Sequence, residues 1–193
     1  MGTIGRRTRA AIGAALVLPL VLLGCSGSAG DDVGRARVGP VTFDLGGGRV
    51  VSGMRASAGE RVIHGAATVT NAGDEPAVLR AGDMLGSVDP ADAGVIDVRV
   101  VDLGPAPGAG DLLGAAPWPT PGWRRWWRSA VPVEEAELPA GGTAEIIYLI
   151  EVRRTGQWLW PQSALDYEVG GTAYRAVADV GFEVCPPGPA CTR

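Results

Sequence analysis

Short apolar runs, separated by glycine- and proline-rich turns, constrain the fold of this chain more than any other feature of its sequence. Within the runs, apolar and polar residues alternate with a period of two, which is typical of strands that bury one face. The 3.6-residue period of an amphipathic helix is nearly absent. The predicted strands cover 38–45, 61–70, 76–79, 95–103, 143–153, 165–169 and 172–184, and the short run 49–54 is expected to pair back on the first of them. About seven short strands joined by turns predict an all-β fold, a single antiparallel β-sandwich.

Turn residues predict how some of these strands connect. The glycine triplet at 46–48 separates the first two runs, so we expect the second run to pair back on the first. The glycine pair at 170–171 favours a two-residue hairpin between the last two runs. The proline- and glycine-rich stretch 104–121 is expected to interrupt regular structure.

Two stretches resemble the immunoglobulin-like repeats of bacterial envelope proteins. The first, 67–76, joins a strand to an Asn-Ala-Gly-Asp turn, and the second, 138–142, is a Leu-Pro-Ala-Gly-Gly turn that leads into a strand. This resemblance implies that residues 38–193 form one immunoglobulin-like β-sandwich domain.

The N-terminal residues have the composition of a secretory signal. Arg6, Arg7 and Arg9 form a positive segment, and the uncharged apolar run 10–23 follows it. This run is shorter than the roughly 20 apolar residues that a membrane-spanning helix needs. The sequence therefore predicts export rather than a spanning helix.

The apolar run ends in Leu-Leu-Gly-Cys at 22–25, which resembles the lipobox of bacterial lipoproteins. The resemblance implies that 1–24 is a lipoprotein signal peptide and that Cys25 becomes a lipidated N-terminus. Acyl chains such as palmitate would then hold the protein at the outer, extracytoplasmic face of the cell membrane. Residues 25–37, which begin with small polar residues, would form a flexible tether. The alternatives are an ordinary secretory signal with a chance cysteine and a permanent transmembrane anchor.

The absence of lysine and the negative net charge exclude several functions. All 17 basic residues are arginine, because the sequence contains no lysine. A Walker phosphate loop and Schiff-base catalysis both need a lysine, so neither is expected. Removing the first 24 of 193 residues leaves 169, with 14 arginines against 21 acidic residues. The resulting net charge of −7 does not favour binding to nucleic acid.

The two remaining cysteines, Cys185 and Cys191, are separated by a proline- and glycine-rich segment that can bend them together. Outside the cell such a pair favours a disulfide. A metal site or a redox pair is the alternative, but neither a neighbouring histidine nor a Cys-x-x-Cys spacing accompanies it.

No catalytic residue, metal site or cofactor is predicted. The single histidine, His64, lies opposite Ile63 and Val69 by simple strand alternation, so we expect it to face outward or to be half-buried. No serine lies in a Gly-x-Ser-x-Gly motif. Thioether and imidazole ligands suit copper, but a copper site would have to combine residues of separate elements with no recognisable spacing: Met54, His64 and Met84. The acidic residues around Gly94 do not follow the spacing of a calcium loop and are expected in a solvated loop: Asp89, Asp92 and Asp97.

One segment has helical spacing. Thr120 and Pro121 favour a helix start, a proline at 132 favours a stop, and the spacing of tryptophans and arginines predicts a short helix over 121–130. Its candidate binding residues are Trp123, Arg124, Arg125, Trp126, Trp127 and Arg128. Three roles are open: a lid whose tryptophans pack on the sandwich, a platform for a partner protein or glycan, and a membrane contact.

Together these features predict a lipid-anchored, extracytoplasmic, non-catalytic protein that binds a partner or has a structural role in the envelope. Its expected partners are the membrane, through the lipid anchor, and an envelope protein or a glycan. The alternatives are a small-ligand carrier that uses tryptophans of 118–127 as a pocket wall, and an accessory subunit of an envelope enzyme. Trp158 and Trp160 share strand parity and are expected to pack together rather than to bind a ligand.

Overall fold

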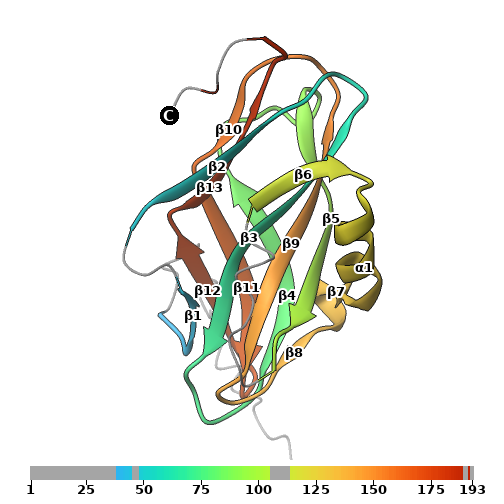
Figure 1. Cartoon of the computed structure of the whole chain (residues 1–193). Helices are drawn as coiled ribbons and strands as arrows, with labels where there is room; N and C mark the ends of the chain where they lie inside the picture. The colour runs from blue at the N-terminus through green and yellow to red at the C-terminus, as the bar shows by residue number, and fades with distance from the viewer. Residues whose placement is uncertain (1–37, 45–47, 105–113, 189–190, 192–193) are drawn as a thin grey trace, which may run out of the picture. The chain divides into compact units, whose positions relative to one another are not determined.

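The computed structural model of the chain describes residues 38–44, 48–104, 114–188 and 191. The predicted signal peptide 1–24, its lipobox and the tether 25–37 lie outside the described residues. The described residues form thirteen strands, one α-helix and one short 3-10 helix, η1 (Val133–Glu135), as Figure 1 shows. The prediction of an all-β fold is confirmed.

The first sheet holds the longest strands. In spatial order it contains β1 (Val41–Asp44), β3 (Arg61–Asn71), β9 (Thr143–Val152), β5 (Ala93–Asp102) and β7 (Val131–Pro132), all antiparallel to their neighbours. A further strand, β6 (Gly114–Trp118), shares one edge of β3 with β1. β6 pairs with the first half of β3, and β1 pairs with its last residues. Every residue of β9 from Ala144 to Ile150 is buried, so both faces of this central strand are covered.

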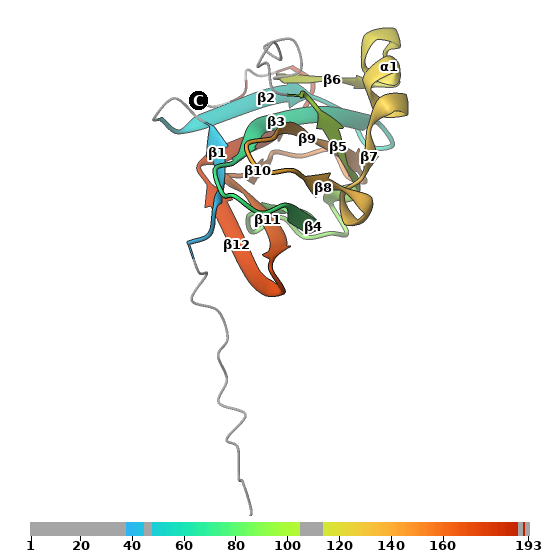
Figure 2. The ribbon, with the colours of Figure 1, turned by 90° about the horizontal axis from the view of Figure 1, so that it is seen from below.

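Two smaller sheets complete the fold. The second contains, in order, β12 (Thr172–Ala178), β11 (Gln162–Val169), β4 (Ala77–Leu85) and β8 (Glu137–Leu138). The third contains β10 (Trp158–Trp160), β13 (Val180–Cys185) and β2 (Val50–Arg55). In Figure 2, the ribbons of β12, β11 and β4 lie on one side of the core and those of β3, β9 and β5 lie on the other.

The strand order is that of an immunoglobulin domain. The seven main strands, taken along the chain, are β1, β3, β4, β5, β9, β11 and β12, and they occupy the positions A to G. The first sheet then has the order A-B-E-D and the second has the order G-F-C, as in immunoglobulin-like sandwiches. The predicted immunoglobulin-like architecture follows from this topology.

All three sheets contribute to one apolar core. The first sheet buries Ile146 and Tyr148, the second buries Leu79 and Leu165, and the third buries Phe182. Each of these side chains is fully withdrawn from water, so all three sheets contribute to the apolar burial that stabilises the fold.

Asn71 joins the two stretches that resemble immunoglobulin-like repeats. Its side-chain amide donates to the carbonyl oxygens of Glu75, Leu138 and Pro139 at 2.8, 3.0 and 3.2 Å. Its Oδ1 accepts from the amide of Gly73 at 3.0 Å. Because Asn71 is completely buried, these bonds satisfy groups that water cannot reach.

Three strand predictions were wrong in their pairing or length. The run 49–54 does not pair back on the first strand, because β2 pairs with β13 in parallel. The run 172–184 divides at Asp179, where the chain leaves the second sheet for the third. The run 76–79 extends to Leu85, and this strand pairs with β11 along its whole length. Turn residues mark where strands end, but they do not say which strand becomes the neighbour.

The stretch 104–121 was expected to lack regular structure, but its second half forms β6. Its pairing with β3 brings Trp118 opposite Arg61. The hairpin predicted at the glycine pair 170–171 is confirmed, since both residues have positive φ angles, of 55° and 77°.

Candidate functional site

The helix predicted over 121–130 is confirmed as α1 (Pro121–Ser129). Pro121 occupies the first turn, where its missing amide hydrogen costs nothing. Thr120 stands at the N-cap with an extended backbone, but its hydroxyl donates to the carbonyl oxygen of Pro117 at 3.1 Å and does not cap the helix. The chain becomes extended again at Ala130 and pairs with β5 through β7.

Two of the three tryptophans of α1 attach the helix to the outer face of the first sheet. Trp123 and Trp127 pack against a second apolar cluster, separate from the main core. The buried members of this cluster come from β3, β5, the end of α1 and β9, and they are Ile63, Val101, Ala130 and Ile147. A helix this short is marginal alone, so this contact is what stabilises it.

Arg99 and Trp118 contact α1 through Trp127. The ring of Trp118 lies 5.3 Å from that of Trp127, tilted by 53°. The guanidinium carbon of Arg99 lies 4.7 Å from the centre of the Trp127 ring, a cation–π contact. The same guanidinium donates to the carbonyl oxygens of Trp127 and Ala130 at 3.4 and 3.5 Å. The sequence did not predict that Arg99 contacts α1, because Arg99 lies on another element, distant from the helix along the chain.

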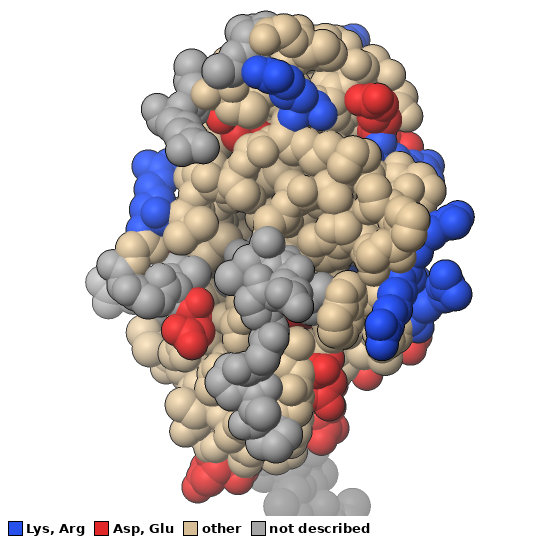
Figure 3. Space-filling view, viewed as in Figure 1, with Lys and Arg blue, Asp and Glu red and all other residues tan. Residues whose placement is uncertain are grey.

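The opposite side of α1 is open to solvent and basic. We call it the arginine face, and it consists of Arg124, Arg125 and Arg128. Trp126 also lies on the exposed side of α1, about 100° around the helix from Arg125. The arginines are exposed, and Trp126 keeps 36% of its surface accessible. None of the three guanidinium groups forms an ion pair with an acid among the described residues. Figure 3 shows basic side chains gathered on the side where Figure 1 places α1.

A shallow hollow of about 390 Å³ lies on this surface, lined by Arg125, Arg128 and Ser129. The hydroxyl of Ser129 donates to the carbonyl oxygen of Trp126, and Nε of Arg128 donates to that of Arg124. The structure thus separates the predicted site residues into two groups. Trp123 and Trp127 anchor the helix, while the other four predicted residues face outward.

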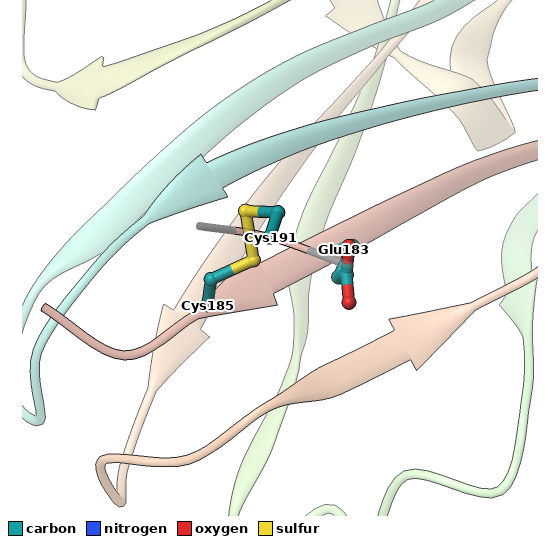
Figure 4. A group of neighbouring side chains, drawn as sticks. All are labelled: Glu183, Cys185 and Cys191. Carbon is teal, nitrogen blue, oxygen red and sulfur yellow. A yellow bond between two sulfur atoms is a disulfide. The ribbon is translucent and has the colours of Figure 1, made fainter. Parts of the chain in front are cut away.

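The predicted disulfide is present. The Cα atoms of Cys185 and Cys191 are 5.5 Å apart and their sulfur atoms are bonded. Glu183 lies beside them on β13, as Figure 4 shows, and its carboxylate accepts a hydrogen bond from the side chain of Gln157. Possible ligand atoms of Glu183 and both cysteines lie within 4.8 Å of one another. Bonded sulfurs are not thiolates, so this group is a structural crosslink and not a set of metal ligands.

A larger hollow of about 1030 Å³ runs along β2 next to this disulfide. Its lining includes Val51, Gly53, Leu159, Glu183 and Cys191. Gly53 leaves room for Cys191, since a Cβ atom at position 53 would lie 3.3 Å from the sulfur of Cys191. A third hollow of about 430 Å³ has Trp118 in its wall, the one tryptophan of 118–127 among its lining residues.

The prediction that His64 faces outward or is half-buried was wrong, because the side chain is 1% exposed. A bulge between Gly65 and Ala67 adds a residue to β3 and reverses the alternation beyond it. Val62 and Val69 therefore share the core, although their positions differ by an odd number and simple alternation would place them on opposite faces. His64 follows Val62 inward, and its ring stacks on Phe182 with centroids 4.6 Å apart.

His64 is held in its neutral form. Its Nδ1 lies 3.2 Å from the carbonyl oxygen of Gly114 and 3.3 Å from the hydroxyl of Ser52. Since a carbonyl only accepts, Nδ1 carries the proton, and Nε2 has no partner among the described residues. Burial lowers the pKa of His64 to about 4, although the bond to Gly114 opposes the shift.

Glu145 is a buried carboxyl group that sequence reasoning missed. It shares the outer face of β9 with Ile147, yet its side chain is completely buried. Thr68 donates to Oε2 at 3.2 Å, and Oε1 has no partner among the described residues. Burial raises the pKa of Glu145 to about 7, and the Thr68 hydrogen bond opposes this shift.

The remaining predicted residues have structural surroundings. Asp92 forms an ion pair with Arg154 at 3.0 Å, and Asp97 forms one with Arg99 at 3.3 Å. Trp160 is buried in the core, and Trp158 packs against it from a half-buried position.

No protein-family model and no curated protein matches this sequence. Among solved structures, the VesB protease of Vibrio cholerae is similar with a TM-score of 0.37 and 13% identity, over 76% of this chain and 32% of that chain. The ASH/PapD-like domain 7 of human CEP192 is similar with a TM-score of 0.34 and 8% identity, over 94% of this chain and 100% of that chain. The chain thus spans about a third of the protease chain. At TM-scores below 0.5 neither similarity carries an argument, so the fold class rests on the strand order itself.

Within the part of the chain that the structure describes, no helix has the length and apolar character needed to span a membrane.

Proposed function

We propose that the protein is a lipid-anchored, extracytoplasmic binding or structural module without catalytic activity, and that the arginine face of α1 is its contact surface. A lipidated Cys25 would hold the chain at the outer face of the membrane, and the immunoglobulin-like domain would present α1. An immunoglobulin-like sandwich is compatible with such a role, because it positions a surface rigidly without needing reactive groups.

One observation carries the proposal of a contact surface. The described part of the chain forms seven ion pairs, yet none of them includes Arg124, Arg125 or Arg128. The protein is acidic overall, with a net charge of −4, so other carboxylates could have paired with this face. Three neighbouring arginines without acids, beside a partly exposed tryptophan, have the composition of a binding surface.

The carrier and accessory-subunit alternatives receive less support. The tryptophans expected to form a pocket wall instead attach α1 to the sheet, and Trp118 alone of 118–127 tryptophans lines the hollow of about 430 Å³. No feature of the described residues favours the accessory-subunit alternative.

Cysteine labelling in intact cells tests the proposal. Because Cys25 would be acylated and Cys185 is bonded to Cys191, an introduced cysteine would be the single free thiol of the processed chain. Gly122→Cys places it on α1, and Gly48→Cys places a matched control elsewhere, since a Cβ atom meets no other atom within 4 Å at either position. A membrane-impermeant maleimide is applied to cells and to protein purified in non-ionic detergent.

We expect both variants to react in detergent and only the Gly48→Cys variant to react fully in cells, because a partner covers α1. Equal reaction of both variants in cells would contradict the contact surface. Failure of both to react in cells would contradict the extracytoplasmic location.

A further inference from the structure

We propose that the arginine face docks on the anionic headgroup layer of the membrane that would hold Cys25, so that α1 lies at the lipid interface. The inference rests on the proposed function and names the occupant of the same surface. It commits to phospholipid headgroups rather than to a partner protein or a glycan.

The geometry of α1 concentrates positive charge on one side. Successive residues of a helix are 100° apart, so Arg124, Arg125 and Arg128 fall within an arc of about 100°. Trp123 and Trp127 point the other way, into the sheet. The arginine face is therefore directed away from the domain, where a planar surface can reach all three guanidinium groups together.

Charge complementarity favours an anionic surface. After the predicted loss of residues 1–24, the chain carries 14 arginines and 21 acidic residues, so most of its surface is repelled by anionic lipid. The arginine face is attracted, because none of its guanidinium groups is neutralised by a described acid. Attraction of one face and repulsion of the rest would orient the domain with α1 toward the membrane.

Trp126 is placed where an interfacial tryptophan would lie. It is 36% exposed on the solvent side of α1, about 100° around the helix from Arg125, and it is absent from both apolar clusters of the domain. Indole rings are enriched at the headgroup level of membranes, because they combine an apolar body with a polar N–H group. Trp126 would therefore enter the interface while the arginines contact phosphate groups.

The size of the surface favours lipid over protein. A helix of nine residues is about 14 Å long and about 10 Å wide, whereas a stable protein interface buries about 800 Å² on each partner. Three arginines near an anionic surface contribute only a modest attraction. This is too weak to recruit a free protein, but it suffices to orient one that acyl chains already hold nearby. The predicted tether of 13 residues has a contour length of about 45 Å, within which the domain can turn.

Quenching of Trp126 by brominated lipid tests the inference. The full lipidated chain is reconstituted into vesicles of neutral phosphatidylcholine, or of phosphatidylcholine mixed with anionic phosphatidylglycerol, with bromine atoms on the acyl chains. The contribution of Trp126 is the difference between wild type and the Trp126→Phe variant. The test variant replaces Arg124, Arg125 and Arg128 by glutamine. The matched control replaces three other exposed arginines by glutamine: Arg49, Arg80 and Arg154.

We expect the Trp126 signal to be quenched on anionic vesicles and to be unquenched on neutral vesicles. Quenching should be lost in the test variant and kept in the control variant. Equal quenching on both kinds of vesicle, equal loss in both triple variants, or no quenching on anionic vesicles would each overturn the inference.

The two proposals can fail separately. Protection of the Gly122→Cys variant in cells, combined with no quenching of Trp126 on anionic vesicles, would keep α1 as a contact surface and give it a protein or glycan partner. Failure of the wild-type chain to remain on any vesicle would contradict the lipid anchor itself.

Discussion

His64 makes the stability of the domain depend on pH. Its folded-state pKa of about 4 lies below the ordinary value of 6.5, so the unfolded chain binds a proton that the folded chain refuses. This contribution is complete above pH 6.5 and is lost as the pH falls toward 4, with a total of about 3 kcal/mol. We predict that His64→Phe removes this contribution and leaves the opposite one of Glu145, so that the free energy of unfolding of the variant rises from pH 7 to pH 4.5. Urea unfolding at a series of pH values measures it, and an unchanged pH dependence in the variant would contradict the burial of His64.

Glu145 acts in the opposite direction over nearly the same range. Its folded-state pKa of about 7 lies above the ordinary value of 4.5, so the folded chain holds a proton that the unfolded chain releases. This contribution is complete below pH 4.5 and is lost as the pH rises through 7, again with a total of about 3 kcal/mol. The two residues therefore offset each other in the wild type. We predict that Glu145→Gln exposes the His64 term, so that unfolding in urea becomes easier from pH 7 to pH 4. A variant as insensitive to pH as the wild type would contradict this.

Asn71 should contribute more to stability than any other single polar side chain of the turns. Replacing it by alanine leaves the carbonyl oxygens of Glu75, Leu138 and Pro139 without their donor in a buried place. We predict a decrease of about 2 to 3 kcal/mol in the free energy of unfolding, measured by denaturant titration. Asn71→Asp is the informative control, because it keeps the acceptor for Gly73 and loses the donors. An effect below about 0.5 kcal/mol for alanine, the size of an ordinary surface substitution, would contradict this role.

At the residue scale, the sequence predicted which residues form turns and the disulfide better than it predicted the side of a strand to which a side chain points. The cysteine pair and the turn around Asn71 could be read from residue types, because glycine, proline and asparagine have local effects. The direction of His64 could not, since a bulge in β3 reversed the alternation. The burial of Glu145 could not be predicted for a different reason, because the neighbours that cover a strand face are distant in sequence.

At the scale of elements, α1 should depend on one tryptophan and be indifferent to the next. Trp127 contacts Trp118, Arg99 and the second apolar cluster, whereas Trp126 is partly exposed. We predict that Trp127→Ala lowers the free energy of unfolding by about 3 kcal/mol and that Trp126→Ala lowers it by less than about 1 kcal/mol. Hydrogen exchange should show loss of protection in the α1 amides for the first variant alone. Equal effects of both would mean that the helix is docked in another way.

The sequence predicted α1 almost to the residue, since the tryptophan spacing, Pro121 and the later proline act locally. Pairing of strands was harder. β2 joins β13 in parallel and β6 forms inside a stretch that composition assigns to a loop. Both depend on which strand edges remain open once the main sheets have formed, and local sequence does not contain that information.

At the scale of the whole molecule, the proposed arrangement combines the described fold with an anchor predicted from the N-terminal sequence. The immunoglobulin-like sandwich supplies a rigid body, α1 supplies its basic surface, and a lipidated Cys25 would hold both at the membrane. The sheet arrangement was predictable because strand number and turn spacing restrict all-β folds to few topologies. The occupant of the arginine face was not, because recognition depends on which side chains remain exposed and unpaired after folding.

Intact-mass and N-terminal peptide mass spectrometry of the protein purified from its own membranes tests the anchor most directly. We predict a chain that starts at Cys25, has lost residues 1–24 and carries diacylglycerol on the sulfur of Cys25 with a further acyl chain on its amino group. A chain that retains residues 1–24, or one that carries an unmodified Cys25, would contradict the lipid anchor.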